Sequence, residues 1–134
     1  MYALLSALFA ALTAIFAKVG IKGVDTDLAT AIRTVVILIL AWGIAFFRGG
    51  TATITTLSKQ NFLFLCLSGI ATGLSWIFYF KALQVGKVSQ VAPVDKLSVA
   101  IAIILSVVFL GEPLSFKTAV GALLIIGGTF VLIF

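Results

Sequence analysis

The chain has 134 residues, of which 63% are hydrophobic and 10% are charged, and its formal net charge is +5. A soluble domain of this length has too little interior to bury so much apolar surface, so the composition indicates a protein whose solvent is lipid. The basic residues are scattered singly, which argues against a nucleic-acid-binding surface. The absence of histidine and the presence of one cysteine, Cys66, argue against a metal site and an intrachain disulfide, and no cofactor is expected.

Five apolar stretches follow one another along the chain, and each is close to the roughly 20 residues that an α-helix needs to cross a bilayer. Their apolar runs are continuous rather than alternating, which favours helices over the strands of a membrane barrel. We expect residues 1–134 to form a single five-helix transmembrane domain. The stretches are Tyr2–Ile21, Leu28–Phe47, Phe62–Leu83, Val88–Leu110 and Phe116–Phe134.

The first stretch contains no acidic residue, and Lys18 near its end is expected to extend its ammonium group to the interface. The polar connection that follows supplies an N-cap for the second helix, for which Thr26 and Asp27 are the candidates. Arg33 lies six residues after Asp27, roughly 9 Å further along that helix. A guanidinium at this depth needs a cavity or a partner, because a charge inside a span is costly. Arg33 is therefore a candidate substrate-binding residue.

The connection between the second and third stretches, residues 48–61, is the longest and is rich in threonine. It is too short to form a soluble domain, so a linker is expected. In the third stretch, Gly69 and Gly73 form a small-xxx-small pair suited to close helix packing. Trp76 and Tyr79, three residues apart, can supply an aromatic wall to a substrate site, and an interfacial aromatic belt is an equally good interpretation.

The fourth stretch contains the most informative tetrapeptide of the chain, Pro93-Val94-Asp95-Lys96. A charge near the bilayer centre costs about 2.5–3.5 kcal/mol, so Asp95 and Lys96 indicate a protein interior or a water-filled path. Neighbouring helical positions point about 100° apart, so each of these two side chains is expected to need its own partner. Pro93 is the predicted hinge, because proline permits a helix break near the site.

An alternative for this segment remains open at the level of sequence. If the helix begins at Pro93, the proline occupies the first helical position and Asp95 complements the positive helix N-terminus. Residues 91 and 92 then belong to a loop, and the helix is short. In that case the tetrapeptide marks a helix start rather than a site.

Arg33 and Lys96 are both expected in the half of the membrane opposite the N-terminus, and Asp95 is the only acid close to them. A pocket built from these residues has a net positive charge. Such a pocket favours an anionic or zwitterionic solute held through a carboxylate or phosphate.

The fifth stretch begins at Phe116, and Ser115 before it suits an N-cap, after Glu112-Pro113 has ended the fourth helix. It is the best candidate for a subunit interface, because small residues let membrane helices approach closely. The basic residues flank both ends of the spans without choosing an orientation, so an antiparallel homodimer is expected. The interface glycines are Gly121, Gly127 and Gly128.

Four segments at their observed spacing, 76–84, 88–93, 96–98 and 109–113, resemble the EamA-type proteins of the drug/metabolite transporter superfamily. They contain an Ala-Pro element at Ala92-Pro93 and a Leu-Gly-Glu element at Leu110–Glu112. The resemblance covers essentially the whole chain and is closest to half-length, five-span bacterial and archaeal members. It implies an all-α integral membrane protein whose five transmembrane helices form one half of a ten-helix inverted-repeat transporter. It also implies a multi-pass protein of the bacterial or archaeal plasma (inner) membrane.

The resemblance does not give a substrate, because the superfamily exports amino acids, metabolites and cationic drugs and flips lipid-linked sugars. Its four-span multidrug members exchange cations for protons at a glutamate in their first helix. The first stretch of this chain has no acid, so that activity is not expected here.

The expected function is export or permeation of a small polar metabolite, anionic or zwitterionic such as an amino acid, by alternating access in a homodimer. The expected partners are membrane lipid and the solute. No enzyme activity is expected, because no nucleophile–base pair is present. Two alternatives stay open. A lipid-linked head-group flippase has a lateral opening to lipid. A non-transporting membrane subunit or scaffold has Arg33, Asp95 and Lys96 at the head-group level.

Overall fold

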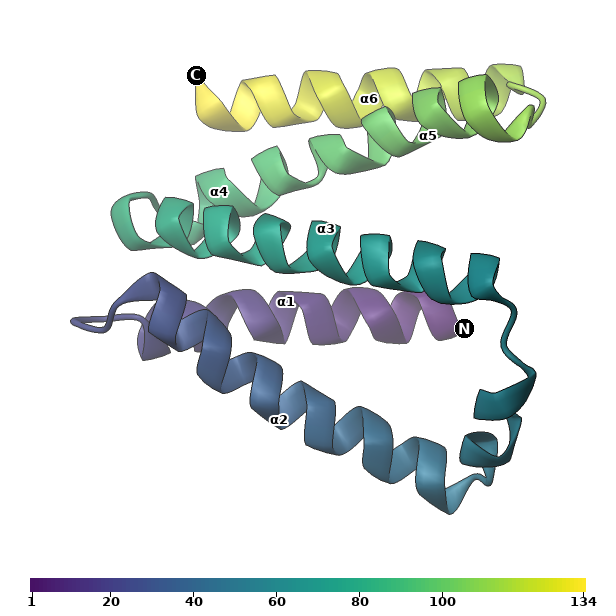
Figure 1. Ribbon diagram of the computed structural model, residues 1–134. Coiled ribbons are helices and arrows are strands. Elements are labelled where there is room, and N and C mark those ends of the chain that lie inside the picture. Colours follow the sequence, from purple (N-terminus) through teal and green to yellow (C-terminus); the bar gives the residue numbers. More distant parts are fainter. The chain divides into compact units, whose positions relative to one another are not determined.

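The computed structural model describes residues 1–134, and every regular element in it is helical. Five helical stretches are long and apolar enough to cross a bilayer, and α4 and α5 together make up the fourth of them. The prediction of an all-α membrane protein with five spans is confirmed. In chain order (Figure 1) the elements are α1 (Tyr2–Gly20), α2 (Thr26–Phe47), the 3₁₀-helix η1 (Gly50–Thr56), α3 (Lys59–Val85), α4 (Val88–Asp95), α5 (Leu97–Leu110) and α6 (Phe116–Ile133).

The N-cap of α2 is Asp25, so the assignment of the cap to Thr26 or Asp27 is wrong. The Asp25 carboxylate accepts hydrogen bonds from the backbone N–H groups of Asp27, at 2.9 Å, and of Leu28, at 3.0 Å. Asp25 has extended backbone angles, which direct its short side chain back over the first turn. Three polar residues in succession could each serve as the cap, and the structure selects the first.

The cap of α6 is the one that the sequence predicts. The Ser115 hydroxyl oxygen accepts a hydrogen bond from the backbone N–H of Thr118 at 3.1 Å. Before it, α5 ends at Leu110 and is capped by Gly111, whose φ of 67° lies in the left-handed region that glycine adopts at low cost. The turn between α5 and α6 is therefore fixed at both of its ends.

The linker between α2 and α3 contains the short helix η1, which the sequence analysis did not predict. Two of its threonines bond back to the backbone: the Thr53 hydroxyl donates to the Gly50 carbonyl at 2.8 Å, and the Thr56 hydroxyl to the Thr53 carbonyl at 2.7 Å. These local bonds satisfy the hydroxyls inside one tight turn. The segment packs against α2.

The fourth span is interrupted at Lys96, which separates α4 from α5 (Figure 1). Pro93 lies inside α4 and has no N–H, so the regular helical hydrogen bond is missing at that position. Three residues later, the Lys96 N–H is shared between the carbonyls of Ala92, at 3.3 Å, and Pro93, at 3.0 Å. The alternative in which the helix begins at Pro93 is wrong, because α4 begins at Val88.

The helices form two compact units, residues 1–15 with 85–134 and residues 16–84. In the first unit, α6 packs against both α5 and α4. Ala100 of α5 and Thr129 of α6 are buried there. The Thr129 hydroxyl lies 3.2 Å from the Pro93 carbonyl and 2.8 Å from the Ile125 carbonyl, so α6 contacts the chain next to the interruption.

In the second unit, residues 16–84, the buried side chains gather where the end of α1, the start of α2 and the end of α3 meet. Beyond Thr30, the side chains of α2 are exposed or half-buried. Figure 1 shows the ribbons of α2 and α3 approaching each other at this end and separating towards η1. The buried residues of this unit are Ala17, Ile21, Thr26, Thr30, Phe80 and Leu83.

Candidate functional site

Arg33 lies on α2 just beyond this buried end, against two aromatic rings of α3. Its guanidinium carbon is 4.8 Å from the ring centre of Trp76 and 4.6 Å from that of Phe80. Both distances are within the range of cation–π attraction. Trp76 and Phe80 are four residues apart, so they share one face of α3. Helix periodicity therefore explains how one arginine contacts both rings.

The hydrogen-bonding state of Arg33 sets it apart from the other basic residues. Its Nη1 atom is buried and has no hydrogen-bond partner, and its guanidinium makes no ion pair with a carboxylate. The two rings attract the positive charge, but they have no oxygen atom that could accept a hydrogen bond from the N–H groups of the guanidinium. The guanidinium is thus held in place with hydrogen-bond donors left for a further partner.

The aromatic wall of Trp76 and Tyr79 stays a prediction, but the structure shows what the two rings contact. Trp76 contacts Arg33, and the Tyr79 ring lies next to that of Phe80, with the two ring centres 6.1 Å apart. The second ring face belongs to Phe80, which is fully buried and which the sequence analysis did not single out. The spacing could have identified Phe80, because a residue four positions after Trp76 lies on the same face of α3.

Polar contacts join the helix ends beside this cluster. The Gln84 side-chain amide donates to the Val24 carbonyl at 2.8 Å, and the Lys18 ammonium donates to the Leu83 carbonyl. Lys81 forms an ion pair with Asp27 at 3.4 Å, with both side chains more than half exposed. Together these contacts connect α3 with the end of α1, the start of α2 and the loop between them.

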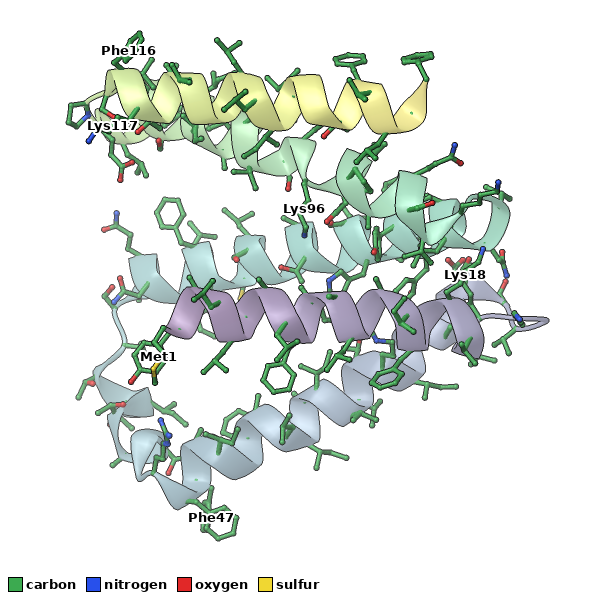
Figure 2. All side chains as sticks on the ribbon, turned by 180° about the vertical axis from the view of Figure 1, so that it is seen from behind. Met1, Lys18, Phe47, Lys96, Phe116 and Lys117 are labelled. Atoms are coloured by element: carbon green, nitrogen blue, oxygen red, sulfur yellow. The ribbon has the colours of Figure 1, made fainter.

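In the other unit, Lys96 occupies the interruption itself (Figure 2). Its ammonium lies 3.2 Å from the Asp95 carboxylate, and the lysine side chain is 56% exposed. The expectation that Asp95 and Lys96 need separate partners is therefore wrong. The helical angle behind it no longer applies where the helix ends at Asp95, and the flexible lysine stem reaches back to its neighbour.

The structure thus brings the predicted residues together in two groups. Arg33, Trp76 and Tyr79 belong to residues 16–84, and Pro93, Asp95 and Lys96 belong to the unit with residues 85–134. A single pocket containing both Arg33 and Lys96 stays a prediction, as do the hinge at Pro93 and the interface glycines.

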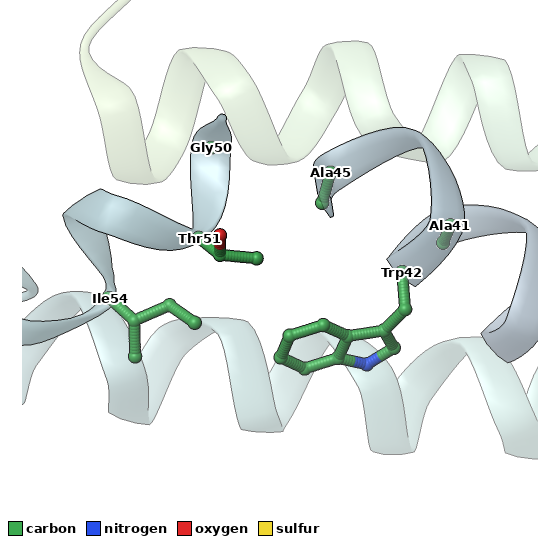
Figure 3. Close-up of a pocket in the computed structure, with 6 residues that line it drawn as sticks. All are labelled: Ala41, Trp42, Ala45, Gly50, Thr51 and Ile54. Carbon is green, nitrogen blue, oxygen red and sulfur yellow. The ribbon is translucent and has the colours of Figure 1, made fainter. Parts of the chain in front are cut away.

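The second unit also has an apolar pocket of about 250 Å³ between α2 and η1 (Figure 3). None of the predicted site residues lines it. The chain has no group of three or more histidine, cysteine, aspartate or glutamate side chains that could hold a metal ion. The pocket is lined by Ala41, Trp42, Ala45, Gly50, Thr51 and Ile54.

Comparison with known proteins defines the class of this molecule. The EamA-like transporter family matches residues 1–134, and the chain belongs to that family. It is 47% identical over 131 residues to the "Uncharacterized transporter in cobO 3'region" of Sinorhizobium sp, an alignment that covers 98% of this chain and 93% of that protein. No solved structure matches the chain. The resemblance read from the sequence motifs is confirmed, and the chain is a multi-pass membrane protein of a transporter family.

Proposed function

We propose that the chain moves a small anionic or zwitterionic metabolite, such as an amino acid, across a bacterial plasma membrane. It does so by alternating access as an antiparallel homodimer. Membership of the EamA-like transporter family supports transport in general, and a relative from Sinorhizobium supports the bacterial setting. The choice of an anionic or zwitterionic solute is supported by Arg33, whose guanidinium forms no ion pair and whose buried Nη1 has no hydrogen-bond partner.

A guanidinium inside an apolar span is costly, by about 2.5–3.5 kcal/mol on insertion scales. The rings of Trp76 and Phe80 offset part of this cost, since a cation–π contact contributes roughly 0.5–2 kcal/mol. No carboxylate of the chain neutralises the charge, and Nη1 is left without a partner. A carboxylate or phosphate of a solute supplies both the missing charge and the missing acceptor.

Arginine suits this task better than lysine because its planar group presents two parallel N–H donors to one carboxylate. The neighbouring rings lie 4.8 and 4.6 Å from the guanidinium carbon and restrict the side chain, so less conformational freedom is lost when the solute binds. The positive charge of Arg33 also repels a cationic drug, so we do not propose export of cations through this site.

Alternating access needs a second half and a moving element. We place the moving element at the predicted hinge Pro93, which lies three residues before the interruption at Lys96. A second copy in the opposite orientation completes an inverted pair of the kind from which many transporters are built. We place the subunit contact at Gly121, Gly127 and Gly128 of α6, because small residues let membrane helices approach closely.

The test is uptake of radiolabelled amino acids into proteoliposomes, with the lipophilic cation tetraphenylphosphonium as the contrasting probe. Loss of one charged hydrogen bond costs about 1.5–3 kcal/mol, so Arg33→Gln is expected to weaken the apparent affinity about 10- to 100-fold. Arg33→Lys is expected to recover part of it. The matched control is Lys22→Gln, which removes an exposed positive charge from the loop before α2.

Uptake of at least one amino acid, reduced in Arg33→Gln and unchanged in Lys22→Gln, supports the proposal. Accumulation of the cation with no amino-acid uptake contradicts the choice of solute. Uptake of an amino acid at equal affinity by Arg33→Gln and the unaltered protein removes Arg33 from the site.

A further inference from the structure

The apolar pocket between α2 and η1 has a construction that the transport proposal does not use. Small side chains of α2, Ala41 and Ala45, leave the space, while Trp42 forms one wall. Thr51 and Ile54 of η1 face the indole across the opening (Figure 3). No ionisable side chain lines it, so it does not suit the polar solute proposed for Arg33.

The position of the pocket along α2 places it near the membrane surface. Ala41 and Ala45 lie in the last two turns of a helix that ends at Phe47, within roughly 10 Å of its end. Trp42 is 53% exposed, and its indole N–H has no acceptor within the protein. Tryptophan side chains gather at the level where lipid head groups meet the acyl chains, because one end of the ring is apolar and the other end is polar. The indole N–H is therefore available to an acceptor of the lipid.

The chain next to the pocket is positively charged. Arg48 is the residue directly after α2, and Lys59 is the first residue of α3, so the two flank η1 on either side. No aspartate or glutamate occurs between Asp27 and Asp95. Neither basic residue forms an ion pair within the chain. An anionic group is thus the complementary partner at this level of the membrane.

We propose that this pocket is a binding site for an anionic phospholipid. One acyl chain fills the apolar space, and Arg48 and Lys59 bind the phosphate. The apolar lining matches the acyl chain, and the flanking charges with the free indole N–H match an anionic, acceptor-rich head group. The lipid would also hold η1 against α2. This site is separate from the one at Arg33 and needs no transport to be detected.

The experiment uses the tryptophan of the pocket as the probe, in full-length protein carrying Trp76→Phe so that Trp42 is the remaining tryptophan. Fluorescence is measured in vesicles that contain brominated phosphatidylglycerol or, separately, brominated phosphatidylcholine at equal mole fraction. Bromine quenches tryptophan on contact. We expect phosphatidylglycerol to associate with the site at least twofold more strongly than phosphatidylcholine.

Two pairs of variants separate this site from ordinary lipid contact. Ala45→Leu fills the pocket and is expected to abolish the preference, whereas Ala52→Leu, on η1 but outside the pocket, is expected to leave it unchanged. The double variant Arg48→Gln, Lys59→Gln is expected to abolish the preference as well. Its control, Lys117→Gln, removes an equivalent charge at the start of α6 and is expected to keep it.

Equal quenching by the two lipids overturns the proposal, as does an undiminished preference in Ala45→Leu. Cross-linking of the same samples tests the other occupant, a second copy of the chain. If Ala45→Leu lowers the yield of cross-linked dimer without changing the lipid preference, the pocket is a subunit contact and the lipid assignment is wrong.

Discussion

Replacement of Arg33 by leucine tests whether this arginine serves solute binding or the stability of the fold. The substitution removes a charge whose presence in the span costs about 3 kcal/mol, and it forfeits the attraction of two rings at 4.8 and 4.6 Å. At about 1 kcal/mol for each ring, the forfeited attraction is about 2 kcal/mol. Because no hydrogen-bond partner of Nη1 is lost, the balance favours the variant by about 1 kcal/mol. Arg33→Leu is therefore expected to be more stable than the unaltered protein and inactive in uptake.

The assay is reversible unfolding in mixed micelles of lipid and denaturing detergent, followed by circular dichroism, with uptake measured on the same preparations. Phe80→Ala serves as the reference for damage to the same cluster. It deletes a fully buried ring and is expected to cost about 3–5 kcal/mol. If Arg33→Leu lowers the free energy of unfolding by more than about 1 kcal/mol, the guanidinium is a satisfied structural group and the reasoning fails.

Three further substitutions test the fold that positions the site. Asp25→Ala removes the cap that accepts two backbone N–H groups and is expected to lower the free energy of unfolding by about 0.5–2 kcal/mol. Lys81→Gln breaks an exposed ion pair with Asp27 and is expected to change the free energy of unfolding by less than about 1 kcal/mol. A larger effect for Lys81→Gln than for Asp25→Ala would contradict the expectation that the cap contributes more than the ion pair. Pro93→Ala restores the missing backbone donor and is expected to straighten Val88–Leu110. Electron paramagnetic resonance with spin labels at the two ends of that segment, in a background without Cys66, should give a longer distance, and an unchanged distance would show that the break does not depend on the proline.

The positions of the spans were predictable because the bilayer imposes both helical structure and a length on every apolar stretch. The cap at Ser115 was predictable for a related reason, since it stands alone between Pro113 and an apolar run. Helix α2 was harder, because Asp25, Thr26 and Asp27 compete for one role. Which of the three residues caps the helix depends on their backbone angles, and the sequence does not give those angles.

The residues of the candidate site were also predictable only in part. The depth of Arg33 in the span made it a candidate, and the spacing of three residues made Trp76 and Tyr79 candidates for an aromatic wall. The ring of Phe80 was missed because an apolar residue in an apolar span carries no signal of its own. At Lys96, helical geometry was extended across a position where the helix stops. Proline predicts a disturbance but does not by itself give the residue at which the hydrogen bonds change, which is Lys96.

The central claim is that Arg33 is kept inside the membrane to bind the anionic group of the transported solute. The most direct measurement is a solid-state magnetic resonance distance between the guanidinium nitrogens and the isotope-labelled carboxylate of the amino acid selected by the uptake assay. The protein carries Arg48→Lys so that Arg33 is its remaining arginine. We expect dipolar coupling consistent with a direct hydrogen bond, and we expect it to be lost when unlabelled amino acid is added in excess. A saturating, transported amino acid with no coupling to Arg33 would contradict it.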